Sequence, residues 1–152
     1  MKQTENLVSL ADMMPLIREM LDQGKSVRIF PRGTSMLPII RQGIDSVVLS
    51  PVPDRLRKYD IPLYRRDNGM YILHRVVGTG TTYTCVGDNQ FDEERNIRHD
   101  QMIAVVTGFY RGEKFHSAEE PVYGIYCRIW RCSRGLRHLW RRGTGWIRRC
   151  LR

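Results

Sequence analysis

The chain has 152 residues, a formal net charge of +9 and four cysteines. This length allows one domain with a sizeable hydrophobic core, so the fold does not need disulfides or a structural metal. All sixteen acidic residues lie at or before Glu120, where sixteen basic residues balance them, whereas residues 121–152 contain nine arginines and no acid. The charge therefore predicts that the C-terminal segment meets an anionic surface, and the neutral body disfavours nucleic-acid binding.

The cysteines and the N-terminus restrict the class of protein further. No CxxC pair and no histidine at metal-ligand spacing accompanies Cys85, Cys127, Cys132 or Cys150. We therefore expect no metal, no cofactor and free thiols in a reducing compartment. Charged residues interrupt the first apolar stretches, which excludes a secretory signal, and no run approaches the ~20 apolar residues that span a bilayer. The protein is expected to be cytoplasmic and at most peripheral at a membrane.

The N-terminal segment, residues 1–25, shows helical periodicity. Apolar residues recur at three- and four-residue steps and end near Gly24; they are Leu7, Leu10, Ala11, Met14, Ile17 and Leu21. This spacing predicts an amphipathic helix that packs on the body. From Ser26 the pattern changes to alternation, which predicts a first strand, and residues 46–52 predict a second strand closed by prolines.

The sequence of the rest of the body, up to residue 120, also predicts β-structure. Residues 61–77 predict two strands joined at Arg66-Asp67-Asn68-Gly69, because Asn-Gly supplies the positive φ angles of a tight hairpin turn. Residues 82–86 continue the sheet, and residues 88–101 are expected to form a charged loop. Residues 102–110 predict a last long strand before a turn at Gly112. The fold class of residues 26–120 is therefore mostly β.

The C-terminal segment, residues 121–152, predicts a basic amphipathic helix. Its arginines surround an apolar series at helical spacing, namely Val122, Ile125, Ile129, Cys132, Leu136 and Leu139. Trp130, Trp140 and Trp146 suit a headgroup boundary, and Gly143 and Gly145 break the helix. Two interpretations stay open, a helix packed on the body or a helix on an anionic membrane surface, because amphipathicity does not distinguish core from lipid.

The segment Gly33-Thr34-Ser35-Met36-Leu37-Pro38 could carry a nucleophile. Gly33 allows an unusual backbone angle, Ser35 is a good N-cap, and Pro38 fits a first helical turn. A hydroxyl at a helix start would lie among backbone N–H groups that stabilise the oxyanion of acyl transfer. The alternative is that Ser35 only caps a short helix.

A serine needs a base to become a nucleophile near neutral pH, and His74 is the candidate. Alternation places it on the same face as Ile72 and Val76, so a satisfied core histidine is the alternative. Asp88 follows the strand at residues 82–86 directly. It could cap its own turn, or it or Asp92 could orient His74 as the third member of a triad.

Three motifs in this order, G-T-S-M-L-P, Y-I-L-H-R-V-V-G and V-G-D-N, resemble the S24/S26 serine peptidases, which include signal peptidases and LexA-like self-cleaving proteins. In that family the serine of G-x-S-M is the nucleophile, and the second motif carries the base. The base is lysine in most bacterial signal peptidases and LexA-like proteins, and histidine in the endoplasmic-reticulum and archaeal type. With His74 at this position, the chain is similar to the histidine type.

The resemblance implies a signal-peptidase/LexA-like β-fold between the two terminal helices. It implies that Ser35 attacks the scissile carbonyl, that the Ser35 backbone N–H lines the oxyanion hole, and that His74 is the base. Asp88 would support the site, and Asp92 approximates the second acidic position. Three features depart from the family pattern. Gly33 stands where many signal peptidases place a serine, and the membrane anchor of the family is missing. The body is preceded by about 25 residues, which are too few for a DNA-binding domain.

The resemblance thus predicts a serine endopeptidase that cleaves a peptide bound as an added extended strand, with small side chains beside the cut. The alternative is a non-catalytic peptide-binding or membrane-binding relative of the same fold.

Overall fold

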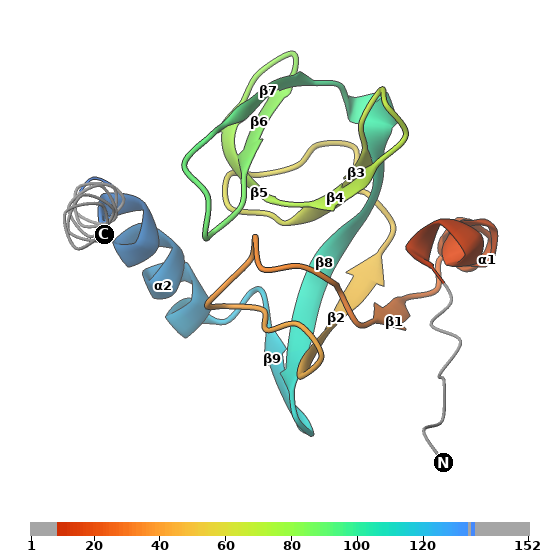
Figure 1. Cartoon of the computed structure of the whole chain (residues 1–152), viewed down its shortest axis with the longest axis horizontal. Helices are drawn as coiled ribbons and strands as arrows, with labels where there is room; N and C mark the ends of the chain where they lie inside the picture. Colours follow the sequence, from red (N-terminus) through yellow and green to blue (C-terminus); the bar gives the residue numbers. More distant parts are fainter. Residues whose placement is uncertain (1–8, 134, 136–152) are drawn as a thin grey trace, which may run out of the picture.

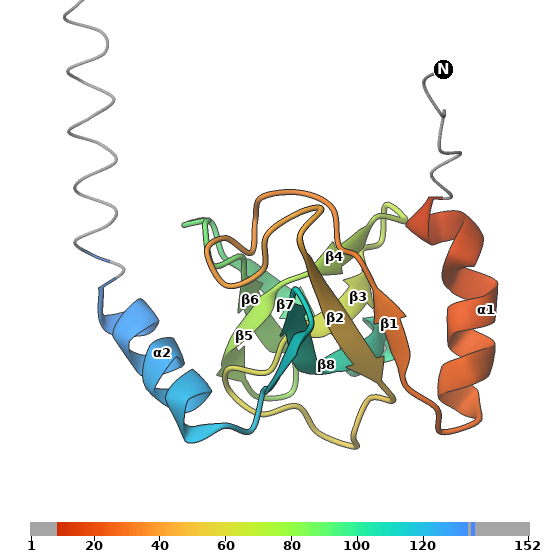
Figure 2. The same cartoon turned by 90° about the horizontal axis from the view of Figure 1, so that it is seen from below.

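The computed structural model describes residues 9–133 and residue 135, and it shows two antiparallel sheets with a helix on each flank (Figures 1 and 2). The elements in chain order are α1 (Leu10–Asp22), β1 (Val27–Ile29), β2 (Asp45–Ser50), β3 (Pro62–Arg65), β4 (Tyr71–Leu73), β5 (Arg75–Thr79), β6 (Tyr83–Val86), β7 (Glu94–Ile97), the 3-10 helix η1 (His99–Gln101), β8 (Met102–Arg111), β9 (Lys114–Ser117) and α2 (Pro121–Cys132). The mostly β class agrees with the prediction from the sequence.

The long strand β8 organises the larger sheet. Its strand order is β1-β2-β8-β3-β4, and β9 also pairs with β8. The smaller sheet has the order β5-β6-β7 and lies at the end of the molecule away from β9 (Figure 1). The hairpin of β3 and β4 pairs Leu63 with Leu73, and its turn lies at residues 66–69 as predicted. Only Gly69, at φ +88°, has the expected positive φ; Asn68 does not.

The strand predicted through residue 77 is interrupted at His74. Before this residue, β4 belongs to the larger sheet, and after it, β5 begins the smaller sheet. The prediction of a loop over residues 88–101 is also wrong in part, because β7 and η1 lie within it. Ile97 is the only buried residue of β7, so this strand lacks the apolar alternation by which a strand is recognised. The short strand β9 was likewise not predicted.

Helix α1 closes one side of the main core. The Ser9 side chain accepts a hydrogen bond from the Asp12 backbone N–H at 3.2 Å, and the Asp12 carboxylate accepts one from the Ser9 backbone N–H. The helix therefore begins with a capping box. Met14, Ile17 and Leu21 are buried in one cluster with residues of β2, β3 and β8. Leu7, which the periodicity also assigned to this helix, lies outside the described residues.

Helix α2 covers the opposite flank (Figure 2). Its inward face consists of Tyr123, Tyr126, Cys127 and Trp130, of which the last two are buried. The apolar series predicted from the sequence points outward instead: the exposed fractions of Val122, Ile125 and Ile129 are 73%, 54% and 62%. Aromatic residues and a cysteine, not the isoleucines, thus hold the helix on the body. The predictions for Leu136, Leu139, Trp140, Gly143, Gly145 and Trp146 lie outside the described residues.

Over residues 9–133 and 135, no helix combines the length and the apolarity needed to cross a bilayer.

Candidate functional site

Ser35 lies on the connection between β1 and β2, in a series of turns and not at a helix start. The Ile40 backbone N–H donates to the Met36 carbonyl at 3.0 Å, and the Leu37–Pro38 peptide bond is cis. The expected helix is absent from residues 33–40, where the apolar run is too short to nucleate a helix. Ser35 therefore does not cap a helix, which removes the simplest structural reason for a serine at this position.

Asn89 holds the Ser35 turn from the other side. Its backbone N–H donates to the Ser35 carbonyl at 2.8 Å, and its side-chain amide donates to the Thr34 carbonyl at 3.1 Å. Within the described part of the chain, the Ser35 backbone N–H donates to no protein acceptor. This N–H is thus available to an acceptor from outside the protein.

His74 occupies the joint between the two sheets and is only 3% exposed. Its Nδ1 lies 3.1 Å from Glu94 Oε1 and 3.4 Å from the Tyr64 hydroxyl. A carboxylate beside Nδ1 favours the tautomer that carries its proton on Nδ1, which leaves Nε2 unprotonated. The imidazole can therefore accept a proton at Nε2.

Gly87 lies close to both the Ser35 carbonyl and the His74 ring. A Cβ atom at this position would lie 2.7 Å from the Ser35 carbonyl oxygen, which is too close for a real side chain, and 3.1 Å from His74 Nε2, which is a tight contact. The turn after β6 thus brings the serine segment and the imidazole together only because residue 87 has no side chain.

Ser35 and His74 line the same small cavity of about 100 Å³, together with residues of the segments 31–33 and 71–73. The described side chains show no hydrogen bond between Ser35 Oγ and the imidazole. Such bonds are often long in unliganded hydrolases and tighten when substrate binds. The geometry brings the nucleophile candidate and the base candidate to one site.

The protonation states at this site suit a general base. Burial is the largest influence on His74 and lowers its pKa below the ordinary 6.5, although the Glu94 carboxylate acts to raise it. Burial acts to raise the pKa of Glu94, but hydrogen bonds from Arg66 and Tyr64 and the charge of His74 outweigh it, so this pKa lies below 4.5. Near neutral pH the imidazole is uncharged and the carboxylate is ionised.

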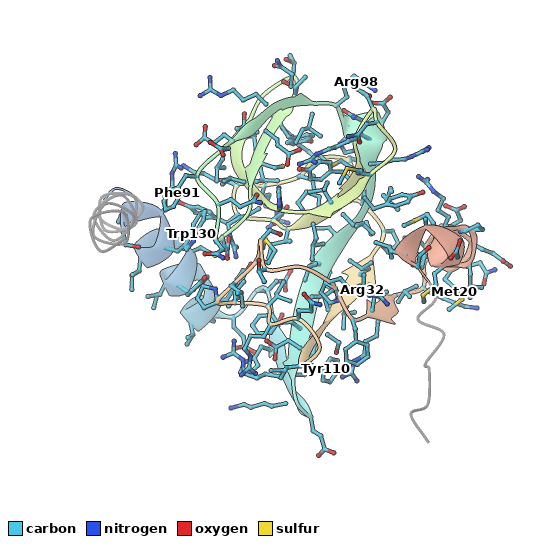
Figure 3. The ribbon with its side chains drawn as sticks, viewed as in Figure 1. Met20, Arg32, Phe91, Arg98, Tyr110 and Trp130 are labelled. Atoms are coloured by element: carbon cyan, nitrogen blue, oxygen red, sulfur yellow. The ribbon has the colours of Figure 1, made fainter. Side chains whose placement is uncertain are left out.

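The Asp88 carboxylate is directed to Arg75 and α2. Arg75 binds it bidentately, at 2.7 Å from Nε to Oδ1 and 2.6 Å from Nη2 to Oδ2, and both side chains are fully buried. The Tyr126 hydroxyl donates to Oδ2 at 3.2 Å, and the Trp130 indole N–H donates to the Asp88 carbonyl at 2.9 Å. Figure 3 shows Trp130 on the side of α2 that faces the body. The sequence left open whether Asp88 caps its own turn or orients His74; in the structure its carboxylate forms a buried ion pair with Arg75.

Asp92 is exposed and lines a groove of about 390 Å³ with Arg66, Asn89 and Glu94. Glu94, two residues further along, holds the carboxylate that reaches the His74 ring. Within the described part of the chain, no group of three or more His, Cys, Asp or Glu side chains is placed to hold a metal ion.

The sequence alone did not indicate Glu94, Tyr64, Arg66 or Gly87 as site residues. Glu94 lay in a segment that was expected to be a loop, and nothing in the local sequence distinguishes it from its acidic neighbours Asp92 and Glu93. The pairing of β7 with β6, which sets Glu94 opposite Cys85, brings its carboxylate to the imidazole. Gly87 was recognisable only as part of the V-G-D-N motif.

Comparison of the chain with protein-family models, with curated proteins and with solved structures found no match.

Proposed function

We propose that this protein is a serine endopeptidase of the signal-peptidase/LexA-like S24/S26 type, acting in a reducing, cytoplasmic compartment. One observation carries the proposal: Ser35 and His74 line one cavity, and Glu94 lies against Nδ1 of the histidine. A serine, an uncharged imidazole and an ionised carboxylate in this order are the groups that acyl transfer needs. The resemblance of the three ordered motifs supports the same assignment.

In the proposed reaction, Ser35 Oγ attacks the scissile carbonyl carbon while its proton moves to His74 Nε2. The Ser35 backbone N–H stabilises the resulting oxyanion, and Glu94 stabilises the imidazolium. His74 then gives the proton to the departing amine, which breaks the C–N bond and leaves an acyl-serine ester. A water molecule, deprotonated by His74, attacks this ester and releases the acid product and the free serine.

The cavity suggests how a peptide binds. The segments 31–33 and 71–73 border it, and β4 lies at the end of the larger sheet, where an extended peptide can add as a further strand. A volume of about 100 Å³ accommodates only a small side chain. We therefore propose substrates with small residues beside the cut.

Mass spectrometry of a peptide library rich in small residues, incubated with the full chain, tests the proposal. We expect cleavage by the wild type and by Ser26→Ala, a serine that bonds Ser50 at the surface, and none by Ser35→Ala or His74→Ala. Cleavage that persists in Ser35→Ala would show that Ser35 is not the nucleophile.

A second candidate function is a non-catalytic peptide-binding relative of the same fold. The deep burial of His74 and the missing Ser35–His74 hydrogen bond favour it. In that case the wild type binds library peptides without cutting them, and Ser35→Ala binds them with the same affinity.

A further inference from the structure

The outward face of α2 is apolar although it is exposed. Val122, Ile125 and Ile129 follow each other at helical spacing along α2, so they form one stripe on the helix surface. The inward face is already filled by Tyr123, Tyr126, Cys127 and Trp130, so the stripe is not needed to hold α2 on the body.

The charge beside this stripe is positive. Arg128 is exposed and lies within one helical turn of Ile125 and Ile129. Arg131 is partly engaged by the body, where its Nη1 lies 3.6 Å from Glu93 Oε1. The acidic residues Glu119 and Glu120 lie before the N-terminus of the helix, so the positive charge lies beside the C-terminal part of the stripe. The sequence of residues 134–152 adds seven arginines, two tryptophans and no acid.

We infer that α2 lies on an anionic lipid bilayer, with Ile125 and Ile129 inserted at the level of the headgroups and Arg128 paired with lipid phosphates. A helix with an apolar stripe next to arginines is the form that binding in the plane of a membrane surface requires. Anionic headgroups complement the acid-free segment 121–152, while a phosphate backbone alone would leave two exposed isoleucines in water. This interaction does not depend on the proposed peptidase activity.

Flotation of the full chain with vesicles tests the inference. We expect binding to phosphatidylcholine mixed with phosphatidylglycerol and much weaker binding to phosphatidylcholine alone. The double variant Ile125→Ser/Ile129→Ser should bind the mixed vesicles about tenfold more weakly or worse, because two apolar side chains no longer enter the bilayer. Arg128→Gln should weaken binding about fivefold, and only on the anionic vesicles.

The matched control is Leu16→Ser/Ile44→Ser, which removes two apolar side chains that are 60% and 56% exposed outside α2. It should bind vesicles as the wild type does. Circular dichroism spectra of both double variants check that the fold is kept.

Three results would overturn the inference. Unchanged flotation of Ile125→Ser/Ile129→Ser would show that the stripe does not touch lipid. Tighter binding to a duplex oligonucleotide than to anionic vesicles would assign the arginines to nucleic acid. A dimer in sedimentation velocity that disappears in the same variant, without vesicle binding, would identify a second copy of the chain as the partner.

Discussion

Glu94 and Asp88 are two carboxylates near one histidine, and their surroundings separate their roles. Glu94 lies against the imidazole at the edge of an open groove, whereas Asp88 is enclosed with Arg75 under α2. The first can respond to protonation of His74 during a reaction. The second neutralises a buried guanidinium, so its removal would leave an unpaired buried charge.

This difference predicts opposite outcomes for two substitutions. Glu94→Gln should lower peptidase activity and shift its rising pH limb to lower pH, because the carboxylate acts to raise the pKa of His74. Asp88→Ala should instead reduce the free energy of unfolding by about 3–5 kcal/mol, since Arg75 loses its partner. The pH dependence of activity measures the effect of Glu94→Gln, and urea unfolding at one pH measures the effect of Asp88→Ala. A Glu94→Gln variant with a wild-type pH profile would exclude the proposed role of this carboxylate.

The wild-type pH profile follows from the burial of His74. An ordinary histidine would give a rising limb near pH 6.5, and burial moves the pKa below that value. The midpoint of the rising limb should therefore lie below pH 6.5. Initial rates across the acid range would measure the limb, and a limb above pH 7 would contradict histidine as the base.

Gly87→Ala should abolish most of the activity while the fold persists. The added methyl group would collide with the Ser35 carbonyl and crowd His74 Nε2, so the Ser35 segment must shift away from the imidazole. Gly80→Ala is the matched control, because its Cβ would meet only the Thr82 carbonyl at 3.7 Å. Initial rates and thermal unfolding of both variants test this. Full activity in Gly87→Ala would mean that the reactive geometry does not depend on this close contact.

At the scale of elements, α2 supports the site through a chain of hydrogen bonds. Trp130 donates to the Asp88 carbonyl, and the adjacent Asn89 donates to the carbonyls of Ser35 and Thr34. The helix thus fixes the turn that fixes the serine segment, although none of its residues lines the cavity shared by Ser35 and His74.

Trp130→Phe should lower kcat several-fold with little change in KM. The phenyl ring keeps most of the packing but loses the indole donor, at a cost of about 1 kcal/mol of stability. Ile129→Ser, on the outward face of the same helix, should leave both kinetic constants unchanged. Steady-state kinetics with a soluble peptide would test whether the Trp130 hydrogen bond positions Ser35. Equal kcat values for Trp130→Phe and wild type would show that it does not.

How much the sequence could predict differs between elements. The β3–β4 hairpin follows from Asn-Gly, and the helical periodicity of residues 10–22 matches α1, because both signals are local. The sequence could not decide whether α2 packs on the body or contacts a membrane surface. Aromatic and aliphatic residues alternate around this helix, and only tertiary contacts decide which face turns inward. Strand β7 has too few apolar residues to be recognised, and Glu94 was missed with it. Ser35 and His74 could be proposed from the sequence because their motifs are local, whereas the contact of Glu94 with His74 depends on strand pairing.

At the scale of the whole molecule, several buried or paired acids and the buried histidine predict acid sensitivity. The pKa values of His74, Glu94 and Asp45 are all lowered in the folded state, the first by burial and the other two mainly by arginine partners that outweigh burial. Each group contributes stability that is complete above its unfolded pKa and is lost as pH falls through its folded pKa. Asp60, whose pKa burial raises, acts in the opposite direction.

The free energy of unfolding should therefore fall as pH decreases from about 6.5, first through His74 and then, below about pH 4.5, through Glu94 and Asp45. Urea unfolding at a series of pH values measures the slope. His74→Asn should flatten the first part of the curve only. An unchanged curve in that variant would show that the histidine does not titrate with folding.

The groups of the proposed site enter the chain one after another during synthesis: Ser35 first, then His74, then the Gly87 turn, and Glu94 last. Because β7 must pair with β6 before the carboxylate reaches the imidazole, a chain unfinished at this point holds Ser35 and His74 without their carboxylate neighbour. The order of strands along the sequence thus delays completion of the proposed site until β7 has been synthesised and paired with β6.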